Sequence, residues 1–433
     1  MSETTPVTIL SGSLGAGKTT LLNHLLSTAG DRNLAVLVND MGEVNVDAEL
    51  VADGSELDLD DGVAELSNGC ICCELQDDLE SAVVRLARER SFDHLLVESS
   101  GISEPAPVAR LFTTESRVAA LYTVDALVTV LDTHRFINSF GGDAVPERVG
   151  SDDDRPLSDL LVDQVEVSNI VLLNKADLCT DAELDEAESL VAALQPAAVT
   201  VRTEFSAVDH DRLLGVDLFD RTELDELPGW KRALAAAEDD HADHGEHGHS
   251  DDHHDQDHDH SDDHNDHGSG DHHDHADHDH DHLHPDEVYG VSSFTVRRRR
   301  PLHPARFAAF LRELPSTIVR AKGTAWIAGS ESRVTVSQAG PSVRATAQGP
   351  WIASLPEVDR NMYRSNRPDL SWDDEHGDRR TELVFIGTEY DEASLRAALA
   401  DAFLSDDEFA ATDATEPAPF PTDAGSEVAI REP

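Results

Sequence analysis

Short apolar runs alternate with amphipathic stretches along the first half of the chain. Continuous runs of Val, Leu and Ile are typical of parallel strands that are buried on both faces. Such runs predict strands at residues 7–11, 34–38, 94–98, 126–132, 169–174 and 198–203. Helix-period patterns lie between them, for example at residues 19–29, 79–89 and 181–194. This alternation predicts an α/β domain with a mainly parallel sheet over residues 1–235.

The second half of the chain changes character twice. Residues 241–284 are almost entirely His, Asp, Gly and Ser, so residues 236–288 are expected to form a disordered linker that buries no apolar area. Residues 289–404 then read as a smaller α+β domain, and residues 405–433 as an acidic, disordered tail. Within the smaller domain we predict strands at 290–296, 324–328, 333–337, 342–347 and 383–387, and helices at 304–314 and 392–403.

The charge of the chain narrows its possible partners. The 433 residues are enough for two or three domains, and the formal net charge is 33 − 87 = −54. Such a surface repels nucleic acid and anionic membranes, so neither is expected as a partner, and it is typical of adaptation to high salt. No leader peptide is expected from the first residues, and no apolar run approaches the roughly 20 residues that a membrane helix needs. A soluble protein of the cytoplasm is therefore expected.

A complete phosphate-binding pattern follows the first predicted strand. The stretch from Gly12 to Thr19 fits G-x-x-x-x-G-K-[ST] and opens a predicted helix. In such loops, glycines let backbone N–H groups surround phosphates, and the helix N-terminus adds a favourable dipole. Lys18 is expected to reach the β and γ phosphates and Thr19 to ligate Mg²⁺. The nucleotide-binding residues predicted here are Gly12, Gly15, Gly17, Lys18, Thr19 and Thr20.

The run Asn174-Lys175-Ala176-Asp177 follows the strand predicted at 169–174. A carboxylate at Asp177 can accept both N1–H and the 2-amino group of guanine, whereas adenine offers no such pair of donors. The three polar residues of this run are therefore predicted to bind the base, and the nucleotide is predicted to be GTP.

Two acidic segments are candidates for switch regions. Glu98 ends a strand and can hold the Mg²⁺ shell or orient the attacking water, so it joins Lys18 and Thr19 as an expected catalytic residue. Gly101 can sense the γ-phosphate through its backbone. The alternative is a polar strand end followed by a turn. Asp40, Glu43 and Asp47 either supply oxygen ligands in a first switch or form a solvated acidic loop.

Three of the four cysteines fall within four residues, at Cys70, Cys72 and Cys73. Neighbouring cysteines bridge poorly, so reduced thiols are expected. Thiolates suit Zn²⁺ or Cu(I), and three of them leave a fourth ligand to come from elsewhere, an incomplete shell that suits transfer. The alternative is that they are small buried hydrophobes. Cys179 is expected to be structural.

Histidine is concentrated in the predicted linker, where residues 241–284 hold 17 of the 23 histidines. Salt adaptation explains Asp enrichment but not His enrichment. Neutral imidazoles bind borderline metals, so the tract is predicted to be a weak, multivalent metal buffer rather than a solvating linker. Farther along, Lys322 and Trp326 form either a docking surface or a surface lysine beside a packed core tryptophan.

Taken together, these motifs resemble the CobW family of GTPases. The phosphate loop, the run from Gly69 to Cys73, the segment from Glu98 to Gly101 and the run from Asn174 to Asp177 occur in that family's order and spacing. Later segments at 320–323 and 383–387 look like its C-terminal domain. Two departures stand out: Val38 replaces an acidic residue common before the Asn of the second strand, and the residues after Gly101 differ from the commoner pattern.

The resemblance implies a P-loop NTPase domain joined to a CobW-like C-terminal domain, and a GTP-hydrolysing metallochaperone. It implies that Cys70, Cys72 and Cys73 are metal ligands, with GTP and Mg²⁺ as cofactors and a client metalloprotein as partner. The metal expected is Zn²⁺, for delivery to a client. The alternatives are Co²⁺ delivery for cobalamin synthesis and a non-catalytic metal-storage protein in which nucleotide only stabilises the fold.

Overall fold

The computed structural model describes most of the two predicted domains. The described residues are 4–30, 32–39, 63–66, 74–113, 117–140, 156–220, 231, 291–367, 370–410 and 418–432. Several predicted features lie outside this part of the chain: the three clustered cysteines, the acidic residues of the first switch candidate and the His-rich segment.

The N-terminal domain is built on a sheet of seven parallel strands in the order β3-β2-β4-β1-β5-β6-β7. The strands are β1 (Thr5–Ser11), β2 (Leu34–Asn39), β3 (Val63–Leu66), β4 (His94–Glu98), β5 (Tyr122–Asp132), β6 (Ile170–Asn174) and β7 (Val199–Arg202). The predicted parallel α/β fold is confirmed. The sequence pattern missed β3, because its four residues give only one alternation inside an acidic stretch.

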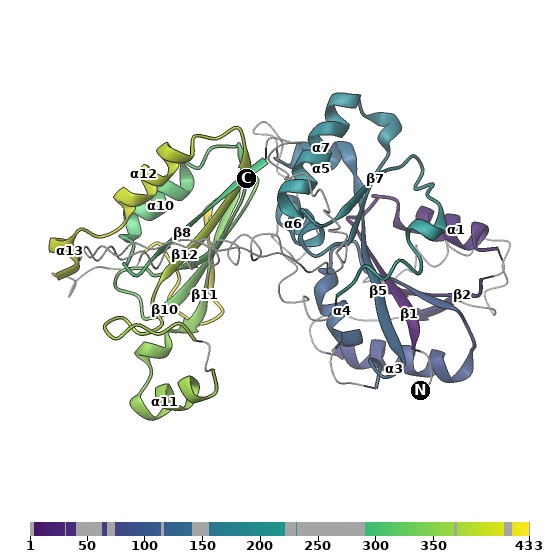
Figure 1. Cartoon of the computed structure of the whole chain (residues 1–433), viewed down its shortest axis with the longest axis horizontal. Helices are drawn as coiled ribbons and strands as arrows, with labels where there is room; N and C mark the ends of the chain where they lie inside the picture. Colours follow the sequence, from purple (N-terminus) through teal and green to yellow (C-terminus); the bar gives the residue numbers. More distant parts are fainter. Residues whose placement is uncertain are drawn as a thin grey trace, which may run out of the picture.

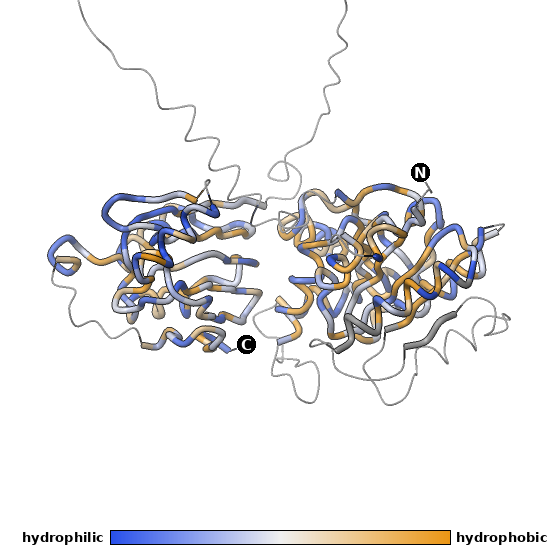
Figure 2. Tube along the Cα trace, turned by 90° about the horizontal axis from the view of Figure 1, so that it is seen from below, coloured by the Kyte–Doolittle hydropathy of each residue, from blue (hydrophilic) through white to orange (hydrophobic). Residues whose placement is uncertain are grey.

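Helices cover both faces of this sheet, which explains why its strands are apolar on both sides. One face packs against α1 (Lys18–Thr28). The other packs against α3 (Glu74–Glu89), α4 (Pro105–Thr113), α5 (Thr133–Phe140), α6 (Leu157–Glu166) and α7 (Asp181–Leu194). Helix α7 begins with a full capping box between Thr180 and Glu183. Figure 2 shows hydrophobic residues running through the inside of the N-terminal domain, the right-hand body in that view.

The C-terminal domain is an antiparallel sheet of six strands in the order β13-β11-β10-β9-β12-β8. The strands are β8 (Val291–Arg298), β9 (Ile318–Ala325), β10 (Ser332–Ala339), β11 (Ser342–Pro350), β12 (Thr381–Thr388) and β13 (Glu427–Arg431). Its core includes apolar side chains of α10 (Pro304–Arg312) and α12 (Glu392–Ala402). Helix α11 (Glu357–Ser365), which the sequence pattern did not predict, has no buried residue.

The prediction of a disordered tail over residues 405–433 is wrong for the part that is described. Residues Asp406–Ala410 form α13, and β13 pairs antiparallel with β11. The acidic composition hid a short alternating pattern, in which Ile430 enters the core and Val428 packs against it. Phe420 is buried as well, and its ring stacks on Phe307 at 5.5 Å between centroids.

Helices α6 and α7 are the elements through which the N-terminal domain meets the C-terminal domain: α6 contacts β10, and α7 contacts β8, β9 and β12 (Figure 1). Val319 and Ala339 of the C-terminal sheet belong to the same buried cluster as the apolar side chains of α6. Trp326 is packed in the core beside His376 and Phe409, as one of the two predicted alternatives had it. Lys322 is only partly exposed and faces Asp163 of α6 at 4.0 Å, so it is an interdomain residue rather than a free surface lysine.

None of the helices in the described ranges is long and apolar enough to cross a membrane.

Candidate functional site

The phosphate-binding loop connects β1 to α1 and requires glycine at two of its positions. Gly12 has φ +139°, and a Cβ there would lie 2.2 Å from the carbonyl oxygen of Val130. Gly17 has φ +114°, and its Cβ would lie 2.4 Å from Nδ2 of Asn174. The left-handed backbone and the close approach therefore both exclude a side chain. The loop predicted from the glycine spacing is present, and it is packed tightly against the ends of β5 and β6.

Lys18 is held inside this loop rather than in solvent. Its side chain is 5 % exposed, and Nζ donates to the carbonyl oxygen of Gly12 at 3.0 Å. The carboxylate of Glu98 lies 3.9 Å from Nζ and is 2 % exposed. The ammonium group is therefore fixed where the loop's backbone folds around it, next to an acid at the end of β4. Thr19 follows at the start of α1 and is partly exposed.

Asn174 ties three segments of the site together. Its Nδ2 donates to the carbonyl oxygen of Ala16 in the phosphate loop at 2.8 Å. Its Oδ1 accepts from the backbone N–H of Ser206 at 2.7 Å and from Oγ1 of Thr203 at 3.2 Å. Both ends of the amide are thus engaged with protein groups, and the buried side chain sets the spacing between the phosphate loop and the loop after β7.

The loop after β7 is part of the site, and the sequence motifs did not identify it. Phe205 and Ser206 both adopt positive φ, at 49° and 56°. Backbone strain of this kind, costing about 1–3 kcal/mol per residue, gathers at functional sites. Oγ of Ser206 donates to the carbonyl oxygen of Gly17 at 3.0 Å, while the side chain of Phe205 is 74 % exposed. The available sequence signal was a Ser-Ala pair just after a strand.

The predicted base-binding run, residues 174–177, is partly buried at Lys175 and exposed at Asp177. Lys175 has φ +59°, and its Nζ donates to a carboxylate oxygen of Asp132 at 2.6 Å. Asp177 is exposed, and so is its neighbour Leu178, at 66 %. An exposed carboxylate next to an exposed apolar side chain is suited to a flat, hydrogen-bonding heterocycle.

The second switch segment lies directly against the phosphate loop. Both the backbone N–H and Oγ of Ser99 donate to the carbonyl oxygen of Leu10 at 2.9 Å. A Cβ on Gly101 would lie 2.8 Å from the backbone nitrogen of Leu14, so only glycine fits there. The structure therefore places Glu98 beside Lys18 and Gly101 against Leu14, both at the phosphate loop.

The described residues contain no group of three or more His, Cys, Asp or Glu side chains that could hold a metal ion. The predicted cysteine ligands lie outside those residues. Cys179 is partly buried. Burial and the carboxylates of Glu183, Asp132 and Asp177 raise the pKa of the Cys179 thiol. A thiol kept protonated is a poor metal ligand, which agrees with a structural role for this residue.

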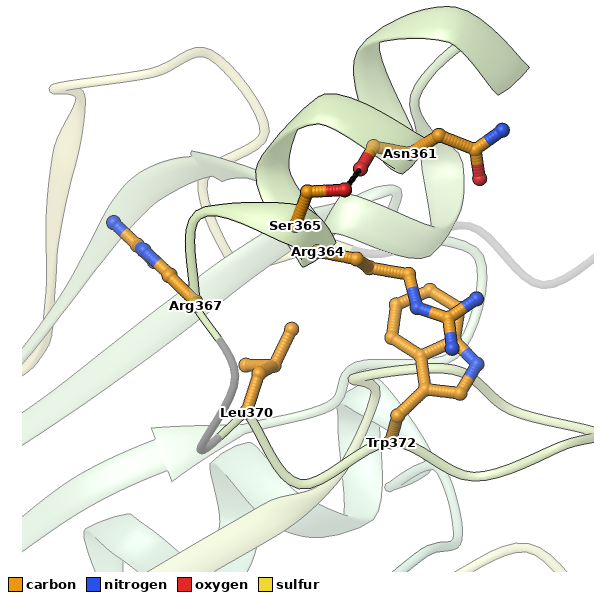
Figure 3. Close-up of a pocket in the computed structure, with 6 residues that line it drawn as sticks. All are labelled: Asn361, Arg364, Ser365, Arg367, Leu370 and Trp372. Atoms are coloured by element: carbon orange, nitrogen blue, oxygen red, sulfur yellow. Dashed lines mark hydrogen bonds between the residues drawn. The ribbon is translucent and has the colours of Figure 1, made fainter.

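The C-terminal domain carries a separate cavity of about 380 Å³ beside α11. Figure 3 shows the guanidinium of Arg364 lying over the ring of Trp372, at 4.2 Å from its centroid, with Arg367 and Leu370 on the other side. Val358 and Met362, one helical turn apart, are exposed on the same helix. The guanidinium of Arg367 points away from that of Arg364 (Figure 3), and the cavity shares no residue with the nucleotide site.

Two family descriptions match the chain. The nucleotide-binding domain of the CobW/HypB/UreG family matches residues 6–202, and the cobalamin synthesis protein cobW C-terminal domain matches residues 291–403. The two matches leave out the His-rich segment and the C-terminal strand β13.

Two curated relatives are similar to the chain over different lengths. The zinc-regulated GTPase metalloprotein activator 1 of Dictyostelium discoideum is 33 % identical over 410 residues, which cover 89 % of this chain and 76 % of that protein. The zinc chaperone CobW of Pseudomonas aeruginosa is 38 % identical over 211 residues, covering 45 % of this chain and 55 % of that protein. The match to the latter thus spans only about half of the relative.

Among solved structures, the Zn(II)-bound YjiA GTPase of Escherichia coli is 20 % identical and is matched over 92 % of this chain and 99 % of that chain, with a TM-score of 0.38. A score this low does not support a detailed comparison. The two domain matches, the long match to the Dictyostelium protein and the geometry of the phosphate loop lead to one conclusion: the chain belongs to the CobW/HypB/UreG family of P-loop GTPases and carries the CobW C-terminal domain.

Proposed function

We propose that this GTPase is a zinc metallochaperone, which holds Zn²⁺ at Cys70, Cys72 and Cys73 and delivers it to a client protein when GTP is hydrolysed. The observation that carries the proposal is the match to a zinc-regulated GTPase metalloprotein activator over 76 % of that protein's length, combined with the Cys-x-Cys-Cys run of this chain. The expected compartment is a reducing cytoplasm, where such thiols stay available.

The nucleotide half of the proposal rests on the geometry of the phosphate loop. Gly12, Gly15 and Gly17 would let the backbone surround the phosphates, and Lys18 would neutralise charge on the β and γ groups. Mg²⁺ would be held by the Thr19 hydroxyl, with Glu98 near enough to hold its water shell or to orient the attacking water. Thr20, exposed at the start of α1, would contact the phosphate edge.

Guanine recognition would fall mainly to Asp177. Its exposed carboxylate would accept from the two guanine donors, and Asn174 and Lys175 would hold the surrounding loops in place. Gly101 is packed against Leu14 of the phosphate loop, so a γ-phosphate would contact the second switch segment directly.

The metal half of the proposal rests on donor chemistry and on chain order. The cysteine run lies between the first switch candidate and β4, which ends at Glu98. Three thiolates suit Zn²⁺, and a fourth position left to water, another side chain or the client would allow the ion to be passed on. The histidines of residues 241–284 would act as a loose reservoir that raises the local metal concentration.

The cysteine site can be tested by zinc competition titration of the full-length protein. Wild type is expected to show one tight site and several weak ones, and the Cys70/Cys72/Cys73→Ser variant is expected to lose the tight site alone. Cys179→Ser is the matched control, because it removes one thiol without touching the cluster. An unchanged tight site in the triple variant would contradict the proposal.

Two alternatives remain distinguishable. Co²⁺ delivery would appear as preferential Co²⁺ binding when both ions compete for the cysteine site. Metal storage without catalysis would appear as many weakly bound ions with no GTP turnover. Removing the P-loop lysine with Lys18→Ala is expected to reduce hydrolysis by about 10²–10³-fold, by analogy with loss of one transition-state donor. A steady hydrolysis rate that this variant abolishes would exclude storage.

A further inference from the structure

Gln164 of α6 is fully buried. Its side chain bonds directly to the second switch segment, and its backbone is linked to the start of the phosphate loop through Thr129. Its Nε2 donates to the carbonyl oxygen of Ser103 at 3.2 Å. Its backbone carbonyl accepts from Oγ1 of Thr129 at 3.2 Å, and that hydroxyl lies 2.7 Å from Oγ of Ser11, the residue before Gly12. The position of Ser103 and the start of the phosphate loop are therefore both fixed against one turn of α6.

The second switch segment is held together as a turn by its own hydrogen bonds. Ser103 closes a turn, because its N–H and Oγ donate to the carbonyl oxygen of Ser100 at 3.1 and 2.9 Å. Gly101 sits inside that turn against Leu14. A displacement of Gly101 by a γ-phosphate would move the whole turn, and the hydrogen bond from Gln164 would transmit that displacement to the helix.

The opposite face of α6 is the docking face for the C-terminal domain. Asp159, Asp163 and Glu166 share this face by helical spacing, and Gln164 is two residues from Glu166, on the other side. Arg320 of β9 makes a bidentate contact with Glu166, from Nε to Oε1 at 2.7 Å and from Nη2 to Oε2 at 3.1 Å. Arg344 of β11 lies 3.2 Å from a carboxylate oxygen of Asp159.

The Arg320–Glu166 contact is buried on both sides, with side-chain exposures of 1 % and 2 %. Arg320 also donates to Oγ of Ser337 and to the carbonyl oxygen of Gln338, so it is fixed to the neighbouring strand β10. Burial opposes the charge of Arg320, but the carboxylates of Glu166 and Asp163 outweigh it and raise the pKa of the guanidinium. A bidentate pair of this kind holds its two partners in one fixed geometry.

We propose that α6 couples the nucleotide state to the C-terminal domain, with Gln164 as the positioning residue for the second switch and the Arg320–Glu166 pair as the contact that carries its displacement to β9. Lys322 adds an electrostatic link, because it lies within 4.0 Å of Asp163 and also interacts with Glu104 of the switch segment. The C-terminal domain then responds to GTP without touching it. This coupling requires nucleotide but no metal, so its test is independent of the cysteine site.

Hydrogen–deuterium exchange on the full-length protein tests the coupling directly. The protein is compared with GDP and with a non-hydrolysable GTP analogue, and the peptides that cover α6, β9 and β10 are followed. Exchange rates there are expected to differ by about fivefold between the two states. A factor of this size corresponds to the net contribution of one hydrogen bond to the free energy of local opening. If the phosphate-loop peptides respond to nucleotide and the β9 and β10 peptides do not, the proposal is overturned.

Gln164→Met removes the donor to Ser103 while keeping the side-chain volume. The nucleotide-dependent difference at β9 is expected to shrink severalfold, with nucleotide binding retained. Gln195→Met is the matched control: Gln195 is equally buried and donates to the backbone carbonyl of Glu166 at 2.6 Å, but not to Ser103. It is expected to keep the difference. A difference that survives in Gln164→Met would show that Gln164 does not transmit the nucleotide state.

If Gln164→Met fails to fold, a variant of the Arg320–Glu166 pair tests the proposal instead. Arg320→Lys keeps the charge but cannot make the bidentate contact, so it is expected to reduce the difference at β9. Arg396→Lys alters a pair with Glu392 that is about half exposed, and is expected to change nothing. Equal nucleotide responses in Arg320→Lys and Arg396→Lys would contradict the proposal.

Discussion

The two domains place their buried polar groups for different purposes. In the parallel sheet, Ser11, Glu98 and Asn174 end three strands at the same edge, where they surround the phosphate loop. In the antiparallel sheet, Arg320 and Gln338 are equally buried, but they hold α6 and the sheet's own backbone. Buried polar groups at the strand ends of the first domain therefore surround the phosphate loop, whereas Arg320 on β9 holds the second domain to α6.

Breaking the docking contact is expected to have the largest effect on stability. Arg320→Met leaves Glu166 buried without its bidentate partner, and removing one member of a buried pair costs about 3–5 kcal/mol. Denaturant unfolding monitored by tryptophan fluorescence measures this loss in the C-terminal domain, because Trp326 and Trp351 are both buried there.

The control for that prediction replaces both charges. An Arg320→Met/Glu166→Leu variant leaves no buried charge unpaired, so it is expected to regain most of the lost stability. If the double variant is as unstable as Arg320→Met alone, the loss comes from packing around β9 rather than from the ion pair.

A buried histidine predicts an acid-sensitive N-terminal domain. Burial lowers the pKa of His94 to about 4, although Asp125 opposes the shift; Arg32 adds to it. Nε2 of His94 lies 2.8 Å from Oγ1 of Thr8. The unfolded chain takes up a proton near pH 6.5 and the folded chain only near pH 4, so stability is lost as pH falls through this window. At about 1.4 kcal/mol per pH unit, the loss approaches roughly 3 kcal/mol at pH 4.

Comparing the wild type with His94→Gln isolates this contribution from the many carboxylates. The stability difference between the two proteins, from urea unfolding midpoints, is expected to change between pH 6.5 and pH 4 and to be constant above pH 7. A difference that does not vary with pH would mean that His94 is protonated equally in both states.

The smallest expected effect separates ligand chemistry from stability within the first domain. Asp177 is exposed, so Asp177→Asn is expected to leave stability unchanged. It is expected to weaken GTP binding by about 10- to 100-fold, because hydrogen bonds to a charged acceptor contribute roughly 1.5–3 kcal/mol each. Isothermal titration with GTP measures the loss. Asp181→Asn, an exposed control four residues on, should bind GTP as tightly as wild type.

Much of the fold could be predicted because the parallel strands are short, continuous apolar runs. Such runs are separated by segments with a helical pattern, so strands and helices were easy to tell apart. His94–Glu98 and Asp181–Leu194 have the predicted bounds. The strand Glu427–Arg431 could not be predicted in the same way, because its five residues are half exposed and follow an acidic, Pro-containing stretch. Helix α11 was missed because it is only nine residues long and because Val358 and Met362, one turn apart, are too short an apolar pattern to predict a helix.

Candidate site residues could be predicted where a motif requires a particular residue type at a particular position. The glycines, Lys18 and Asp177 stand in motifs whose spacing follows from phosphate and base geometry. Thr203 and Ser206 were not predictable, because they act through a hydroxyl and a backbone N–H that many loops could supply. Gln164 and Arg320 were missed for a related reason: their partners are far apart in sequence, and only the fold brings them together.

We propose that nucleotide and zinc share one set of conformational states. Titrating GTP against the full-length protein, with and without saturating Zn²⁺, tests that claim most directly, because coupling between two ligands must be reciprocal. Zn²⁺ is expected to change GTP affinity by about 5- to 150-fold, and GTP is expected to change Zn²⁺ affinity by the same factor. The Cys70/Cys72/Cys73→Ser variant is expected to lose both effects. Identical GTP affinities with and without Zn²⁺ would contradict the claim.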